Sequence, residues 1–140
     1  EMRVALRWAS LRARRTGGRV GLVRVIRGAD FQHWAAVGNL MQVEAREEAE
    51  QLLQEHAAEV LRLYGSMPIL YLREGETKSS VVELVQEDKD IRILVLAAST
   101  GRRGPGPLIN HLTKKAIGQL RIPVTIIPGG LTDEQIDTLV

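Results

Sequence analysis

The stretch that decides the fold is Ile91-Arg-Ile-Leu-Val-Leu-Ala-Ala-Ser-Thr-Gly-Arg-Arg-Gly-Pro-Gly-Pro107. Its apolar part, residues 93–97, has the length and β-branched content of a strand buried on both faces. Small residues then lead into a glycine-rich loop, residues 101–106, and an apolar helical pattern follows. Backbone N–H groups and the helix dipole converge on anions at such a strand–loop–helix junction. The stretch therefore predicts an α/β fold with a candidate phosphate site, and it does not indicate a reaction.

Composition limits the classes of protein that need to be considered. The 140 residues suit a single domain, and the 44% hydrophobic and 26% charged content is typical of a globular protein. The absence of Cys excludes disulfides, thiolate metal sites and a Cys nucleophile. A net charge of +2 is too small to indicate nucleic acid, and no apolar run is long enough for a membrane span. We therefore expect one cytoplasmic domain, residues 1–140, without a nucleic-acid or membrane partner.

The chain on both sides of this stretch alternates between helical and strand patterns. Apolar periodicity predicts helices that end at Gly17, span residues 40–64 and 77–86, and run from Pro107 to about residue 120. Strands are predicted over residues 19–27, 68–72, 93–97 and 122–127. Strict alternation implies right-handed crossovers and a parallel sheet that is covered by helices on both faces. The expected architecture is therefore a three-layer α/β/α domain.

The two ends of the chain carry separate expectations. No capping residue precedes the first helix, and a chain that opens on a helix lacks the strand that would begin the alternation. We expect upstream residues that form a first, central strand, and a gap between the strands at Val25 and Val95 in its absence. At the other end, residues 131–140 predict a short helical tail, in which Thr132 and Gln135 form a capping box.

Several segments together carry a recognisable pattern. The most specific are Ile93-Leu-Val-Leu-Ala-Ala-Ser-Thr-Gly101 and Ile122-Pro-Val-Thr-Ile-Ile-Pro128, supported by Val4-Ala-Leu-Arg-Trp-Ala9, Val20-Gly-Leu-Val-Arg-Val25 and Arg73-Glu-Gly-Glu-Thr-Lys78. With these segments, nearly the whole chain resembles the universal stress protein family of the UspA type. The resemblance implies a Rossmann-like parallel sheet of order 3-2-1-4-5, whose central first strand is missing here.

The glycine-rich loop departs from the motif of the ATP-binding members of that family. Their motif is Gly-x-x-Gly, nine residues, and then Gly-Ser or Gly-Thr. Gly101-Arg-Arg-Gly104 supplies the first half, but Lys114 stands nine residues later in place of glycine. Counting back from the last strand places the Gly-Ser position near Asn110-His111 and the first glycine at Ala97 or Ala98. The pair of small residues that lets backbone amides approach a phosphate is therefore missing or replaced.

The resemblance nevertheless implies a site for ATP or AMP, with or without Mg²⁺, between the strand ends and the glycine-rich loop. The residues that it places there are Val25, Ala98, Ser99, Thr100, Gly101, Arg102, Arg103, Gly104, Gly106, Asn110 and His111. In this reading Val25 faces the adenine, and Arg102 and Arg103 supply charge. In the alternative interpretation Val25 is a core residue, the two arginines are solvated and the glycines only allow the chain to turn. Pro105 and Pro107 favour this interpretation, because neither has an N–H group to donate to a phosphate.

The resemblance also implies a homodimer that forms through the last strand. The interface residues are Val124, Thr125, Ile126 and Ile127, and an apolar edge strand independently needs a cover. The function implied is that of a dimeric stress-response regulator that binds a nucleotide. The alternative is a dimeric interaction module of the same fold without a nucleotide.

Enzymatic and metal-dependent functions receive little support. Ser99 and Thr100 have no identifiable base that would activate them, so we predict no catalytic residue. The expected enzymatic activity is at most weak ATP hydrolysis. Neither the His-x-Gly-His nor the Ser-Gly-Gly-x-Asp-Ser signature of nucleotide-dependent enzymes is present, and the predicted strands lack the clustered acids of a phosphoacceptor domain. His33, His56 and His111 are too scattered to predict a metal site. Trp34 lies in a predicted loop over residues 31–39, as a lid or a dimer contact.

Overall fold

The computed structural model describes residues 1–27 and 35–140, with residues 35–40 as backbone only. Helices and strands alternate along the chain in the order α1 (Met2–Thr16), β1 (Gly21–Ile26), α2 (Ala35–Tyr64), β2 (Ile69–Glu74), α3 (Thr77–Glu87), β3 (Leu94–Ala98), α4 (Pro107–Lys114), the 3-10 helix η2 (Ile117–Gln119), β4 (Val124–Pro128) and α5 (Asp133–Leu139). This order confirms the predicted α/β class.

The strands form two parallel pairs. β1 lies beside β2, with Leu22 opposite Leu70, and β3 lies beside β4, with Leu96 opposite Ile126. Within the described residues each pair is a separate two-stranded sheet, and no strand joins β1 to β3. The pairs correspond to the outer pairs of the predicted order 3-2-1-4-5, which is therefore incomplete in the structure.

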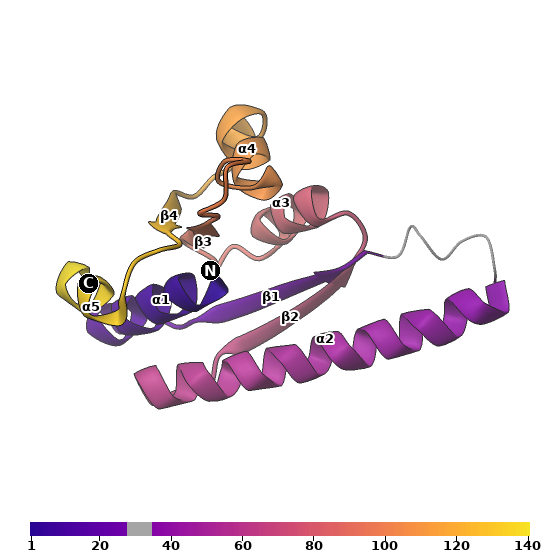
Figure 1. Ribbon diagram of the computed structural model, residues 1–140, viewed down its shortest axis with the longest axis horizontal. Coiled ribbons are helices and arrows are strands. Elements are labelled where there is room, and N and C mark those ends of the chain that lie inside the picture. Colours follow the sequence, from indigo (N-terminus) through magenta and orange to yellow (C-terminus); the bar gives the residue numbers. More distant parts are fainter. Residues whose placement is uncertain (28–34) are drawn as a thin grey trace.

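Helices cover both faces of the strands (Figure 1). α1 and α2 pack against each other on one side, where α1 contacts β3 and β4 and α2 contacts β1 and β2. On the other side α3 packs against α4 and β1 (Figure 1). This arrangement is the expected three-layer α/β/α order.

The core is aliphatic, as the low aromatic content predicts. Val60 of α2 and Leu6 of α1 pack around β1, whereas Val4 of α1 joins Ile127 of β4. Val82 of α3 packs with Leu112 and Ala116 on the opposite face, beside β3. Burying each large aliphatic side chain contributes about 1.5–3 kcal/mol, so these clusters hold the helices on the strands.

Several predicted boundaries are wrong. α2 begins at Ala35 rather than Leu40, because Ala35 and Ala36 favour helix. α4 ends at Lys114 and continues only as η2, because the N–H groups of Lys115 and Ala116 both donate to the carbonyl of His111. Of the predicted loop over residues 31–39, the part with His33 and Trp34 lies outside the described residues, and residues 35–39 are helical. No helix in the described ranges has the length and apolarity needed to cross a membrane.

The predicted C-terminus of the first helix and the predicted N-terminus of the last helix are confirmed. α1 ends at Gly17, whose φ of 74° places it in the left-handed region that favours glycine. α5 begins with the predicted capping box: the Gln135 N–H donates to Thr132 Oγ1 over 3.2 Å, and the Thr132 N–H donates to Gln135 Oε1 over 2.9 Å. The tail helix packs on α1, where the buried Ile136 joins Val4.

Candidate functional site

The candidate site begins where β3 and β4 end side by side. Ala98, the last residue of β3, is paired with Pro128 of β4. Gly129, which follows Pro128, lies so close to β3 that a Cβ atom there would be 2.3 Å from the carbonyl oxygen of Ala98. Only glycine fits this position. It allows the ends of β3 and β4 to lie in close contact next to Ser99 and Thr100.

The turn that follows β3 holds a carboxylate. Oε1 of Glu1 accepts hydrogen bonds from the Thr100 N–H over 3.2 Å and from the hydroxyls of Ser99 and Thr100 over 3.4 Å each. The hydrogen bond from the Thr100 backbone is the main cause that lowers the pKa of Glu1 below its ordinary value. A negatively charged oxygen is therefore stabilised at the place where the sequence predicts a phosphate.

The glycine-rich loop is partly closed by its own hydrogen bonds. The Ser99 N–H donates to the Pro105 carbonyl over 3.0 Å, and the Gly104 N–H donates to the Gly101 carbonyl over 3.3 Å. Gly104 and Gly106 have φ values of 88° and 117°, so the turn itself requires glycine at both positions. This part of the loop matches the alternative interpretation, in which the glycines only allow the chain to turn.

Gly101 differs from the other two glycines. Its backbone is not in the left-handed region, and a Cβ atom there would meet only Ser99 Oγ, at 3.6 Å. Neither conformation nor packing therefore requires glycine at this position. Its N–H group donates to Ser99 Oγ over 3.3 Å, next to the oxygen of Glu1. The missing side chain leaves space beside the turn, while the N–H group itself is used by Ser99.

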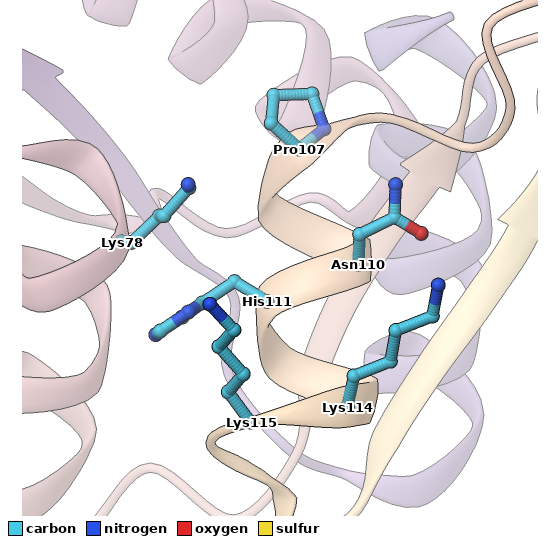
Figure 2. A pocket seen from close by; sticks show the side chains of 6 residues that line it. All are labelled: Lys78, Pro107, Asn110, His111, Lys114 and Lys115. Carbon is cyan, nitrogen blue, oxygen red and sulfur yellow. The ribbon is translucent and has the colours of Figure 1, made fainter.

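A hollow lined by lysines lies beside the loop, between α3 and α4 (Figure 2). This lysine hollow has a volume of about 210 Å³ and is lined by Lys78, Pro107, Asn110, His111, Lys114 and Lys115. Lys78 faces α4 from α3, and His111 of α4 and Lys115, which follows α4, extend toward it (Figure 2). Asn110 and Lys114 lie on the other side of α4 (Figure 2). Lys78 and His111 are half-buried, whereas Lys114 and Lys115 are exposed.

The structure brings most of the predicted nucleotide-site residues to one edge. Ala98 and the loop residues up to Gly106 are contiguous beyond β3, and Asn110 and His111 line the adjoining hollow. Arg102 and Arg103 are exposed and form no ion pair with any residue that the structure describes. Val25 stands apart from this group, because it lies in the other sheet, opposite Arg73 of β2.

Sequence reasoning missed Lys78 and Lys115. Lys78 is the second residue of α3, directly after the turn that follows β2. The turns after parallel strands gather at one edge of a sheet, and this rule offered a signal for placing Lys78 beside the loop after β3. Lys115 offered no comparable signal, because the predicted helix ran past it and gave it no special position.

The predicted dimer residues do not share one environment. Val124 and Thr125 of β4 are half-buried, Ile126 is 38% exposed, and Ile127 is buried in the core with Val4. One side of β4 pairs with β3, and its other side pairs with no strand in the described part of the chain. The strand therefore presents an open backbone edge together with one exposed apolar side chain.

A second basic surface lies between α1, α2 and α5. This arginine cleft has a volume of about 570 Å³ and is lined by Arg7, Leu11, Arg14, Arg15, Arg62, Leu63, Asp137 and Val140. Arg7 binds both oxygens of Asp137 over 2.8 and 2.9 Å, and Arg62 Nε donates to Glu59 over 2.9 Å. The hydrogen bond to Asp137 raises the pKa of Arg7, while the nearby charge of Arg62 acts in the opposite direction.

Among the residues that the structure describes, no three His, Asp or Glu side chains are grouped closely enough to hold a metal ion. The candidate site is composed of backbone N–H groups, hydroxyls, cationic side chains, the ring of His111 and the carboxylate of Glu1. Backbone N–H groups, hydroxyls and cationic side chains are the groups that proteins use to hold an anion.

Comparison with known proteins adds one finding. The model of the universal stress protein family matches residues 1–128, which covers all the strands, the glycine-rich loop and the lysine hollow. The comparison with curated proteins found no match, and the comparison with solved structures found none either.

Proposed function

The chain belongs to the universal stress protein family, and we propose that it binds an adenine nucleotide, ATP or AMP, and acts as a homodimeric stress-response regulator. The observation that carries the nucleotide proposal is the turn after β3, where Thr100 and Ser99 donate three hydrogen bonds to one carboxylate oxygen of Glu1. A phosphate oxygen makes the same demand for converging donors.

The surroundings of that turn support a phosphate rather than another carboxylate as the ligand. Gly101 has no side chain that would block the approach of a ligand to the turn. The next two residues, Arg102 and Arg103, are exposed. Guanidinium matches the geometry of phosphate oxygens. Any Mg²⁺ in such a site would arrive with the phosphates, because Mg²⁺ keeps most of its water and needs few protein ligands.

Binding of the nucleotide is tested by isothermal titration with ATP, AMP and adenosine at up to millimolar concentrations. We expect ATP and AMP to bind and adenosine to bind more weakly. Thr100→Val should weaken ATP binding about fivefold, since a hydrogen bond contributes about 1 kcal/mol. Thr138→Val, which removes an exposed hydroxyl of α5, is the matched control. No ATP binding, or equal effects of the two substitutions, would contradict the proposal.

Glu1 provides a second test with the opposite sign. Its carboxylate occupies the donors that a phosphate needs, so the two anions compete for Thr100 and Ser99. Glu1→Gln should therefore increase the affinity for ATP, and it should lower the dependence of that affinity on pH near the pKa of the carboxyl group. A decrease in affinity would show that Glu1 belongs to the binding groups rather than to the competitors.

The homodimer proposal is supported by β4. Its open backbone edge and the exposed side chain of Ile126 are the features that invite pairing with a second strand. Light scattering coupled to size exclusion should show a dimer that Ile126→Lys converts to a monomer. Leu61→Lys, which changes a similarly exposed residue of α2, should leave the dimer intact. A monomeric natural protein would refute this part.

The second candidate function is a dimeric interaction module without a nucleotide. It is favoured by the internal hydrogen bonds of the loop, which occupy the N–H groups of Ser99 and Gly104, and by Pro105 and Pro107, which have no N–H group. A dimer that shows neither heat nor a thermal shift with millimolar ATP would establish this alternative.

A further inference from the structure

The lysine hollow carries cationic charge that no carboxylate balances. Lys78, Lys114 and Lys115 form no ion pair with any residue that the structure describes. The lining contains no acidic side chain, and its remaining polar groups are the amide of Asn110 and the ring of His111. Like charges held together in this way repel each other, and a bound anion would relieve that repulsion.

Lys78 stands at a position that is unfavourable for a cation in an isolated helix. It lies in the first turn of α3, where the helix dipole is positive. The N-cap residue is Glu76, but its side chain makes no capping hydrogen bond, and the first turn itself has no acidic residue. α5 shows the usual solution in the same molecule, with Asp133 and Glu134 in its first turn and a complete capping box. The N-terminal turn of α3 and the amine of Lys78 therefore both favour an anion.

The size of the hollow limits its occupant. A volume of about 210 Å³ is below the roughly 300–1,000 Å³ of pockets that enclose whole organic ligands. It is sufficient for one or two phosphate groups that reach in from outside. Lysine amines are compact, mobile point charges and suit phosphates that approach in more than one orientation.

We propose that the lysine hollow between α3 and α4 binds a compact, multiply charged phosphate. Lys78 contacts it from α3, Lys115 from the turn that follows α4, and His111 donates a hydrogen bond from α4. The shared chemistry is that of a short inorganic polyphosphate or of a small sugar bisphosphate. The site requires no adenine, although Asn110 and His111 of its lining are also among the residues predicted for the nucleotide site. The nucleotide proposal is tested at Thr100 and this one at Lys78 and Lys115, so the failure of one can be told from the failure of the other.

The test is a calorimetric titration of the full chain with inorganic tripolyphosphate and, separately, with fructose 1,6-bisphosphate. The test variant is Lys78→Gln/Lys115→Gln. Its matched control is Arg12→Gln/Lys89→Gln, which removes the same charge from exposed residues outside the hollow. Circular dichroism checks that both variants keep their helices. The signals of the His111 ring, followed by NMR, report whether the ligand enters the hollow.

We expect at least one of the two probes to bind and to move the His111 signals. Removing both lysines should weaken that binding about tenfold, because each exposed charge pair contributes up to about 1 kcal/mol, whereas the control should change it less than twofold. The probe that binds more tightly identifies the source of the phosphate. Failure of both probes to bind, or equal losses in the test variant and the control, would overturn the proposal. Binding of ATP that depends on Thr100 would stand in either case.

Discussion

The lysine hollow and the arginine cleft both gather cationic side chains, but only the arginine cleft supplies its own counter-charges. In the arginine cleft, Arg7 is held by Asp137 and Arg62 by Glu59. Arg14 and Arg15 stand in the last turn of α1, where cations offset the negative end of the helix dipole. In the lysine hollow, His111 and Lys114 likewise stand in the last turn of a helix, α4. Lys78, however, meets neither a carboxylate among the described residues nor a helix C-terminus.

The difference shows that the number of cations does not identify an anion site. The arginine cleft is the larger of the two and has four guanidinium groups. Arg7 docks α5, Arg62 pairs with Glu59 within α2, and Arg14 and Arg15 end α1. The smaller lysine hollow retains charge that is available for a ligand. The predictions below change the charge of one surface or the other, or weaken the part of the fold that supports it.

The largest effect is expected at the closed strand ends that support the glycine-rich loop. In Gly129→Ala the new Cβ atom would lie 2.3 Å from the Ala98 carbonyl oxygen, and the strain should lower the free energy of unfolding by about 3 kcal/mol. Urea denaturation measures this change. Gly118→Ala, where nothing lies within 4 Å of the new atom, is the control and should be nearly neutral. Equal stability of the two variants would contradict the close approach.

The second largest effect is expected when the lysine hollow is given a carboxylate of its own, as the arginine cleft has. Asn110→Asp adds a carboxylate to the lining, which should weaken the binding of tripolyphosphate about tenfold through repulsion. Asn110→Ser removes the amide without adding charge and should cost much less. Calorimetric titration measures both affinities. A similar loss in the two variants would mean that balance of charge does not control the site.

A smaller effect is expected at the helix that the arginine cleft holds. Thr132→Ala removes the hydroxyl that caps α5 and should lower the free energy of unfolding by about 1 kcal/mol. Amide exchange should increase in α5 and remain unchanged in α3 and α4. Faster exchange at the lysine hollow would show that the two surfaces are coupled. Thr16→Ala, at the last residue of α1, serves as a control outside any N-cap.

The pH dependence should also separate the two surfaces. The hydrogen bond from Arg7 lowers the pKa of Asp137 below the ordinary Asp value. A carboxyl group with a lower pKa in the folded chain stabilises it above the unfolded pKa, and that contribution is lost as the pH falls through the folded pKa. Docking of α5 should therefore weaken modestly below about pH 4. Amide chemical shifts of α5 that stay constant down to pH 2 would contradict the ion pair.

The smallest effect is expected from Arg14→Gln/Arg15→Gln. These arginines line the cleft without a carboxylate partner among the described residues, but they offset the negative end of α1. Affinity for tripolyphosphate should change less than twofold, and the helix should lose a little stability. A tenfold loss of affinity would move the anion site to the arginine cleft.

The sequence predicts the alternation of elements because each one carries a clear period and most carry a marked end, such as Gly17 or Thr132. The loop after β3 is likewise placed correctly, since an apolar strand and glycines define it locally. The contact of Glu1 with Thr100 and the place of Lys115 in the lysine hollow are not predictable in the same way. Both depend on how distant elements pack, and a local pattern of residues does not encode that packing.

The limits of boundary prediction have a similar cause. The apolar positions Ile117 and Leu120 extend the helical pattern beyond Lys114, but the chain tightens into η2 after the carbonyl of His111 accepts two hydrogen bonds. Periodicity reports which face of a helix is apolar, and it does not report where the backbone hydrogen bonds change. Lys115 therefore enters the lysine hollow from a turn rather than from a continuous helix.

The most direct test of the nucleotide proposal is an NMR titration of the ¹⁵N-labelled protein with ATP. We expect the amide signals of Thr100 and Gly101 to shift and those of Arg14 and Arg15 to stay in place. Shifts confined to the arginine cleft, or no shifts at millimolar ATP, would contradict it.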